Sequence, residues 1–155
     1  VGAYRNALEF AKEREQFGRP IAEFQGLQWM LADMSVQIEA ARSLLHKAAL
    51  SAGQNGSPFP DPTLAAQGKI FTSEMALKVT NDALQMFGAR GYSRNYPMER
   101  LARDARMFTI GGGTAQILRT VVASRILEMK LPQTREGFLQ MAEREASKKG
   151  LQAAE

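Results

Sequence analysis

The chain has 155 residues, of which 45% are apolar and 23% are charged, and its formal net charge is +4. These values are typical of one soluble globular domain, and no membrane span is predicted because there is no run of about eighteen apolar residues. The chain has no cysteine and a single histidine, which excludes disulfides, thiol catalysis and a histidine-rich metal site.

The first predicted element is a helix over residues 1–14, because apolar residues recur there at steps of three and four. They are Ala3, Ala7, Phe10 and Ala11. No capping residue precedes Val1, so we expect this helix to continue a longer one and the chain to be a fragment. Gly18 and Pro20 then predict a turn over residues 16–20, since glycine ends helices and the residue before proline is extended.

A long helix is predicted over residues 22–52, because apolar residues alternate steps of three and four along it. The seam consists of Phe24, Leu27, Leu31, Met34, Ile38, Ala41, Leu45 and Ala48. Such a seam favours packing on other helices at a shallow angle, as in a four-helix bundle. We interpret Met34 as core filler. His46 has no acid or nucleophile near it in the sequence, and no catalytic role is predicted for it.

Glycine and proline predict a loop over residues 53–62, and a third helix follows over residues 63–87. This helix is apolar on two faces, which indicates burial between neighbouring helices.

The stretch from Gln85 to Gln116 predicts a helix end, a glycine turn, a short basic helix, a second glycine turn and the start of another helix. Gly113 and Thr114 precede an apolar run and offer a hydroxyl cap and free backbone N–H groups, which suit an anionic group such as phosphate. The simpler interpretation is that the stretch only connects helices of a bundle.

A fourth main helix is predicted over residues 114–129, and an amphipathic helix over residues 134–149 carries Phe138, Met141 and Ala142 on its apolar face. The predicted architecture is an all-α, up-and-down four-helix bundle. We assign residues 1–130 to the bundle and residues 131–155 to an extra helix and tail, which serve either as an oligomer contact or as a surface helix.

An ordered set of motifs resembles the C-terminal helical domain of the acyl-CoA dehydrogenase family of flavoproteins. Arg14-Glu-Gln-Phe-Gly-Arg-Pro-Ile21 resembles the family's R-x-x-F-G-x-P-I, and Lys69-Ile-Phe-Thr-Ser-Glu74 resembles its K-x-x-x-S-E. The others are Phe24-Gln25, Leu31 to Met34, Gln85 to Tyr92, Tyr96 to Arg100, Arg103-Asp104 and Gly113-Thr114. The resemblance covers roughly residues 1–128.

The resemblance implies that FAD lies across a subunit boundary in a homodimer or homotetramer. Arg14 and Phe17 would contact the FAD of a neighbouring subunit, with the planar guanidinium of Arg14 paired with a pyrophosphate oxygen. The remaining implied cofactor-binding residues are Gln25, Gln85, Gly88, Ala89, Thr114 and Gln116, and Gly113 would face the substrate. Without the resemblance, Arg14 is most simply a solvated partner of the helix dipole, and Phe17 most simply covers the end of the bundle.

The implied chemistry is α,β-dehydrogenation of an acyl-CoA thioester, in which a carboxylate takes the proton at Cα, FAD takes the hydride and an electron-transfer flavoprotein receives the electrons. Many members carry the catalytic Glu in I-Y-E-G-T, but here Gly112 occupies that position. A minority branch, similar to isovaleryl- and long-chain-type enzymes, places its Glu on the preceding helix. We therefore expect the base upstream of Val1, no catalytic residue within this chain, and no activity of the fragment alone.

Other expectations follow from these features. The triple glycine of residues 111–113 leaves room for a branched or bulky acyl chain, and Ala89 replaces a glycine that is usual in the family. The alternative function is a non-catalytic homologue that acts as a binding module, including a nucleic-acid-associated one, or as an oligomerisation module. No cluster of Lys and Arg with interleaved aromatic residues supports nucleic-acid binding. We expect a cytoplasmic location in a bacterium in preference to a mitochondrial matrix.

Overall fold

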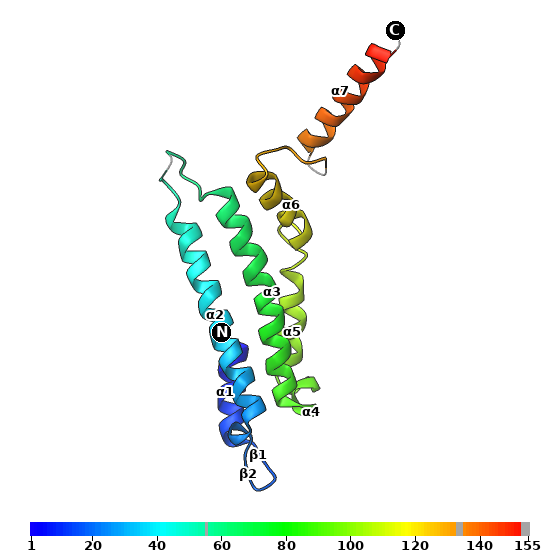
Figure 1. The fold of residues 1–155 in the computed structure, drawn as a ribbon. Coiled ribbons are helices and arrows are strands. Elements are labelled where there is room, and N and C mark those ends of the chain that lie inside the picture. The colour runs from blue at the N-terminus through cyan, green and yellow to red at the C-terminus, as the bar shows by residue number, and fades with distance from the viewer. Residues whose placement is uncertain (55, 133–134, 153–155) are drawn as a thin grey trace.

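The computed structural model describes residues 1–54, 56–132 and 135–152, and it confirms the prediction of an all-α bundle (Figure 1). The long helices are α2 (Gln25–Leu50) and α3 (Pro62–Phe87), and the shorter ones are α1 (Gly2–Glu13), α4 (Ala89–Tyr92), α5 (Met98–Met107), α6 (Ala115–Ile126) and α7 (Arg135–Gln152). A hairpin of β1 (Glu15–Gln16) and β2 (Arg19–Pro20) and the 3-10 helix η1 (Ile21–Glu23) join α1 to α2.

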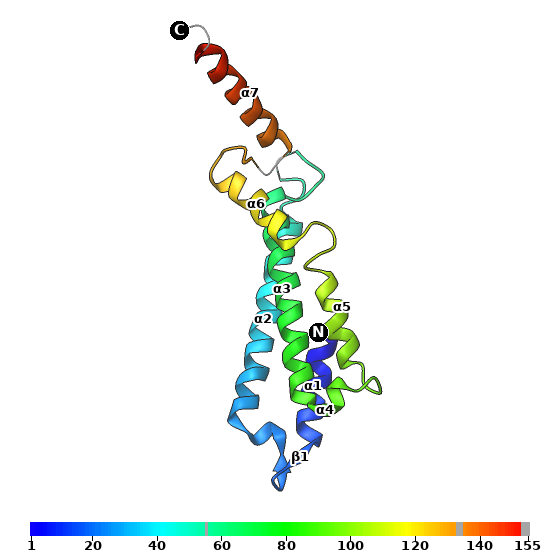
Figure 2. The same ribbon diagram turned by 90° about the vertical axis from the view of Figure 1, so that its right-hand side faces the viewer.

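Helix α3 is the centre of the bundle, because α1, α2, α4, α5 and α6 all pack against it. Helices α2 and α3 form a long antiparallel pair (Figures 1 and 2). Helix α1 lies beside the half of α3 that ends at the hairpin, and α5 and α6 follow one another along α3 in the fourth position of the bundle. The predicted up-and-down order is therefore present, with two helices sharing the last position.

Local chemistry sets the ends of these helices. Asp61 caps α3, because its Oδ1 accepts the backbone N–H of Leu64 at 2.9 Å, and Pro62 stands at the first helical position, where its missing N–H costs nothing. Helix α2 begins at Gln25 and not at residue 22, because Phe24 is extended with φ −86° and ψ 120°. At the far end of α3, Gly88 has φ +56°, in a region that side chains with a Cβ avoid.

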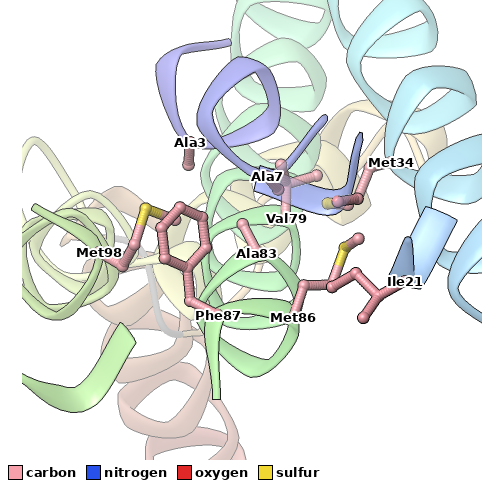
Figure 3. Close-up of a cluster of buried hydrophobic side chains, with 10 residues drawn as sticks. Ala3, Ala7, Ile21, Met34, Val79, Ala83, Met86, Phe87 and Met98 are labelled. Carbon is pink, nitrogen blue, oxygen red and sulfur yellow. The ribbon is translucent and has the colours of Figure 1, made fainter. Parts of the chain in front are cut away.

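The buried core lies where α1 meets α3 (Figure 3). Ala3, Ala7 and Ala11 form one face of α1 and are between 0% and 4% exposed, as their spacing predicts. Their small side chains allow the backbone of α1 to lie close to α3, where Val79 and Ala83 face them. Met34 is completely buried, which confirms its interpretation as core filler.

Helix α7 extends away from the bundle (Figures 1 and 2). Its apolar side chains are exposed, with Phe138 at 67% and Met141 at 41%. The helix agrees with the predicted one, although residues 133, 134 and 153–155 lie outside the described residues. Its role as an oligomer contact or a surface helix stays a prediction. Among the residues that the structure describes, no helix combines the length and apolarity needed to cross a membrane.

We predict that Gly91→Ala destabilises the chain by about 1–3 kcal/mol, the usual cost of overpacking. A Cβ at Gly91 would lie 2.5 Å from the backbone oxygen of Leu84 and 2.8 Å from Cβ of Phe87, so α4 would have to move away from the end of α3. The measurement is the free energy of unfolding in urea. Gly26→Ala is the control: Gly26 lies in a helix with no atom within 4 Å of the new Cβ, and we expect a gain of about 0.5–1 kcal/mol. Equal stability of Gly91→Ala and Gly26→Ala would contradict the prediction.

Candidate functional site

A hollow of about 300 Å³ lies at the hairpin end of the bundle, where α1, α3 and α4 meet. Its lining includes three of the predicted cofactor-binding residues, Arg14, Gly88 and Ala89. The other lining residues are Phe10, Gln16, Ile21, Leu27, Met86, Phe87 and Arg90. Side chains that are far apart in the sequence thus meet around one space, as the cofactor prediction requires.

The hairpin positions Arg14 at this hollow. Arg14 ends α1 in an extended conformation, with φ −76° and ψ 122°, and its backbone oxygen accepts the N–H of Ile21 at 2.7 Å. Phe17 and Gly18 form the turn with φ +53° and +77°. Within the described residues, no carboxylate forms an ion pair with Arg14. Its guanidinium is therefore available to a ligand.

Three other predicted residues do not line the hollow. Phe17 lies at the tip of the hairpin and is 92% exposed, and its ring has an edge-on contact with Phe24 at a centroid distance of 6.2 Å. The alternative that Phe17 covers the end of the bundle is therefore wrong for this chain. Gln25 is exposed at the start of α2, and Gln85 is exposed one turn before Gly88.

The chemistry of the hollow suits an anionic ligand that has apolar parts. Its lining contains two arginines, Arg14 and Arg90, and no Asp or Glu. One wall is aromatic, because the rings of Phe10 and Phe87 stack in parallel with centroids 4.1 Å apart and an interplanar angle of 13°. A nucleotide with phosphate groups and flat ring systems matches both features.

The second group of predicted residues lies in the loop between α5 and α6. Gly112 and Gly113 have φ +67° and +88°, and a Cβ at Gly112 would meet no atom within 4 Å. Lys69 of α3 donates from Nζ to the backbone oxygen of Gly113 at 2.5 Å, which ties this loop to the bundle. The loop is therefore open around Gly112 and anchored at Gly113.

Thr114 ends this loop as the N-cap of α6. Its Oγ1 accepts the backbone N–H of Ile117 at 3.2 Å, as the Gly-Thr pattern predicts. The hydroxyl proton of Thr114 is not used by this bond, so it can be donated to a ligand. Gln116 is exposed in the first turn of the same helix.

The two groups of residues lie far apart in one chain. Lys69 is in α3 and contacts the loop before α6, whereas Gly88 is the C-cap of α3 and lines the hollow. At a helical rise of about 1.5 Å per residue, the step of 19 positions from residue 69 to residue 88 corresponds to about 28 Å. The resemblance implied that Arg14 and Phe17 contact the FAD of a neighbouring subunit, and the structure places Arg14 far from Thr114 and Gln116 within one chain.

Sequence reasoning missed three residues of these sites. Phe10 was assigned only to the core face, whereas its ring also lines the hollow. Arg90 stands between Gly88 and Gly91 in the sequence, and its place in the lining of the hollow is seen only in the structure. Lys69 belongs to the Lys69–Glu74 motif, but spacing alone does not connect it with Gly113.

In the part of the chain that the structure describes, neither a metal site nor a reactive His or Glu is supported. No group of three His, Cys, Asp or Glu side chains there lies close enough to hold a metal ion. His46 is exposed on α2. Glu74 near the α6 loop is already engaged, because both its carboxylate oxygens accept from Arg119, at 2.7 and 2.8 Å.

We predict that Thr114→Ala lowers the free energy of unfolding by about 1 kcal/mol, because the N–H of Ile117 loses its acceptor. Thr114→Ser keeps an Oγ at the same position and should remain within about 0.5 kcal/mol of the parent chain. Urea unfolding monitored by circular dichroism measures both values. If the serine variant lost as much stability as the alanine variant, the hydroxyl would not be acting as a cap.

Comparison with protein families gives a match over residues 2–127 to the model described as "Acyl-CoA dehydrogenase, C-terminal domain". Among curated proteins, the chain is 67% identical over 138 residues to a "3-sulfinopropanoyl-CoA desulfinase" of Cupriavidus necator, a match that covers 89% of this chain and 34% of the relative. It is 44% identical over 125 residues to a short-chain-specific acyl-CoA dehydrogenase of Clostridium acetobutylicum, which covers 81% of this chain and 32% of that protein.

Solved structures agree with this assignment. Butyryl-CoA dehydrogenase from Megasphaera elsdenii has a TM-score of 0.75 and 43% identity, with 81% of this chain and 32% of that chain covered. A structure described as an FAD complex of PigA has a TM-score of 0.74 and 27% identity, with 80% of this chain and 32% of that chain covered. The chain thus spans about a third of the length of the relatives that it matches.

Proposed function

Because this chain belongs to the acyl-CoA dehydrogenase family, whose C-terminal domain it matches from residue 2 to 127, we propose that it forms one wall of the flavin and thioester sites of a larger FAD-dependent enzyme. The relatives are about three times as long as the matched region, which supports the view that a helical domain and a β-domain lie outside this chain. The resemblance to the family is confirmed by the family match and by the relatives.

We assign the hollow at the hairpin end to FAD. Arg14 would bind a phosphate oxygen of the cofactor, and the backbone at Gly88 and Ala89 allows close approach, since no side chain projects from Gly88. The hollow is too small for the whole cofactor, so other groups must complete the site. When bound, FAD supplies hydride-transfer chemistry that no side chain of this chain provides.

The separation of the two groups of residues supports a site shared between subunits. About 28 Å along α3 is too far for Arg14 and Thr114 to contact the same part of one bound cofactor. We therefore propose that the hollow serves the FAD of a neighbouring subunit, while Thr114, Gln116 and Gly113 face the site of their own subunit. This arrangement requires a homodimer or a homotetramer.

For the substrate, we propose an acyl-CoA thioester with a sulfinate group on C3. A dehydrogenase must remove a proton from Cα and needs a carboxylate close to it, whereas a desulfinase must break the bond between carbon and sulfur. The observation that carries this proposal is the 67% identity to a 3-sulfinopropanoyl-CoA desulfinase, and the absence of a carboxylate at Gly112 is compatible with it. The balanced reaction uses one water: the C–S bond is replaced by C–H, and the sulfur leaves as sulfite.

A second candidate is α,β-dehydrogenation with a carboxylate supplied from outside this chain. The relatives at 43–44% identity are named as dehydrogenases, and this favours the candidate. An electron-transfer flavoprotein would then be the electron acceptor. The openness of the loop at Gly112 leaves room for a branched acyl chain in this case.

We predict that the full-length protein releases sulfite from 3-sulfinopropanoyl-CoA without lasting bleaching of its flavin. The experiment adds this thioester, butanoyl-CoA or a branched acyl-CoA without oxygen, and follows sulfite release and flavin absorbance together. Bleaching by butanoyl-CoA or by the branched acyl-CoA without sulfite release from the sulfinate would establish the dehydrogenase instead. A bound flavin with neither response would favour the non-catalytic homologue.

We predict that Arg14→Gln weakens FAD binding by the full-length apoprotein about 10- to 100-fold, because a charge-assisted hydrogen bond contributes about 1.5–3 kcal/mol. Titration of FAD fluorescence measures the dissociation constant. Arg5→Gln is the matched control, since Arg5 is an exposed arginine on the same helix outside the hollow. Equal dissociation constants for the two variants would show that the hollow does not bind the diphosphate.

A further inference from the structure

We propose that Arg90 is a second cationic ligand of the cofactor diphosphate in the hollow. It is far from Arg14 in the sequence but lines the same hollow. This inference rests on the proposed assignment of the hollow to FAD. The observation behind it is that Arg90 lines the hollow together with Arg14, Gly88 and Ala89.

The glycines on either side place Arg90 at the hollow. Gly88 reverses the chain at the end of α3 with φ +56°, and α4 begins at the next residue. Gly91 is buried against the end of α3, where a Cβ would lie 2.5 Å from the backbone oxygen of Leu84. Because neither glycine has a side chain, α4 folds tightly against α3 and holds Arg90 beside Phe10.

An aromatic stack orients the guanidinium. Phe87 stacks in parallel on Phe10, and the Cζ of Arg90 lies 5.8 Å from the centroid of the Phe10 ring. A guanidinium above an aromatic ring is held by the π-electrons and keeps its N–H groups free at its edge. Arg90 is therefore positioned without using the donors that a phosphate would need.

Arg90 is not held by an ion pair among the described residues, and since exposed Arg5 and Arg94 also have none there, it is the position at the hollow that distinguishes Arg90. Arg42, Arg103 and Arg119 each have a carboxylate partner, Glu39, Glu99 and Glu74 respectively. Neither Arg90 nor Arg14 has one within the described residues. Two positive charges around one hollow repel each other unless an anion lies between them, and a diphosphate carries the two negative charges that balance them.

The test compares FAD dissociation constants of the full-length apoprotein and of Arg90→Gln, Arg90→Lys and Arg94→Gln, at low and at raised salt. We expect Arg90→Gln to bind FAD about tenfold more weakly, with a smaller salt dependence, since one charge-assisted contact is lost. Arg90→Lys should lie in between, because it keeps the charge without the planar fork. Arg94→Gln should bind within about twofold of the parent, since Arg94 is exposed and does not line the hollow.

Circular dichroism of each apoprotein shows whether a variant has folded, and Arg90→Lys still provides the comparison if Arg90→Gln has not. The inference is overturned if Arg90→Gln binds as tightly as the parent, or if Arg94→Gln weakens binding equally. If Arg14→Gln weakens FAD binding and Arg90→Gln does not, the assignment of the hollow to FAD is kept and the proposed role of Arg90 is rejected. A parent protein that binds no FAD overturns both.

Discussion

The parallel stack of Phe10 on Phe87 is the contact on which the ligand end of this domain depends. Phe10 lies one turn before the end of α1, and Phe87 is the last residue of α3. By joining these two helix ends, the stack sets where the hairpin leaves α1 and where α4 leaves α3. The edge contact from Tyr96 to Phe87, at a centroid distance of 6.0 Å, extends the cluster to the segment before α5. Arg14, which follows α1, and Arg90, in α4, then line the same hollow.

The residues suited to ligand binding lie near the two ends of α3, and the helices between them only pack against one another. At one end of α3, glycines and arginines surround the hollow. Near the other end, Lys69 and Thr114 define the shape of a glycine loop. Between them the helices are packed through small apolar residues and carry no group suited to catalysis in the part of the chain that the structure describes. Such a domain suits the binding and orientation of ligands, and under the proposed function the reacting groups come from the cofactor and from the rest of the enzyme.

Sequence reasoning predicted the fold well because helical periodicity and breakers are local signals. The alanine face of α1, the seam of α2 and the loop before Pro62 all follow from spacing of three and four residues or from glycine and proline. Of the site residues that the resemblance implied, Arg14, Gly88 and Ala89 line one hollow, whereas Phe17, Gln25 and Gln85 do not. The sequence alone does not tell which way a side chain points at a helix end, and the cofactor-binding roles of these residues stay a prediction. The roles of Arg90 and Lys69 depend on contacts between distant segments, which a single sequence does not record.

The alanine face of α1 has a consequence for ligand recognition. Ala3, Ala7 and Ala11 are buried and none of them lines the hollow, yet their methyl groups set the distance between the axes of α1 and α3. Phe10 and Arg14 are carried by the same helix or its end, and Met86 and Phe87 by the other, so a change in that distance moves opposite walls of the hollow together or apart. A larger side chain at any of these alanines would act as a spacer. The width of the hollow thus depends on residues that do not line it.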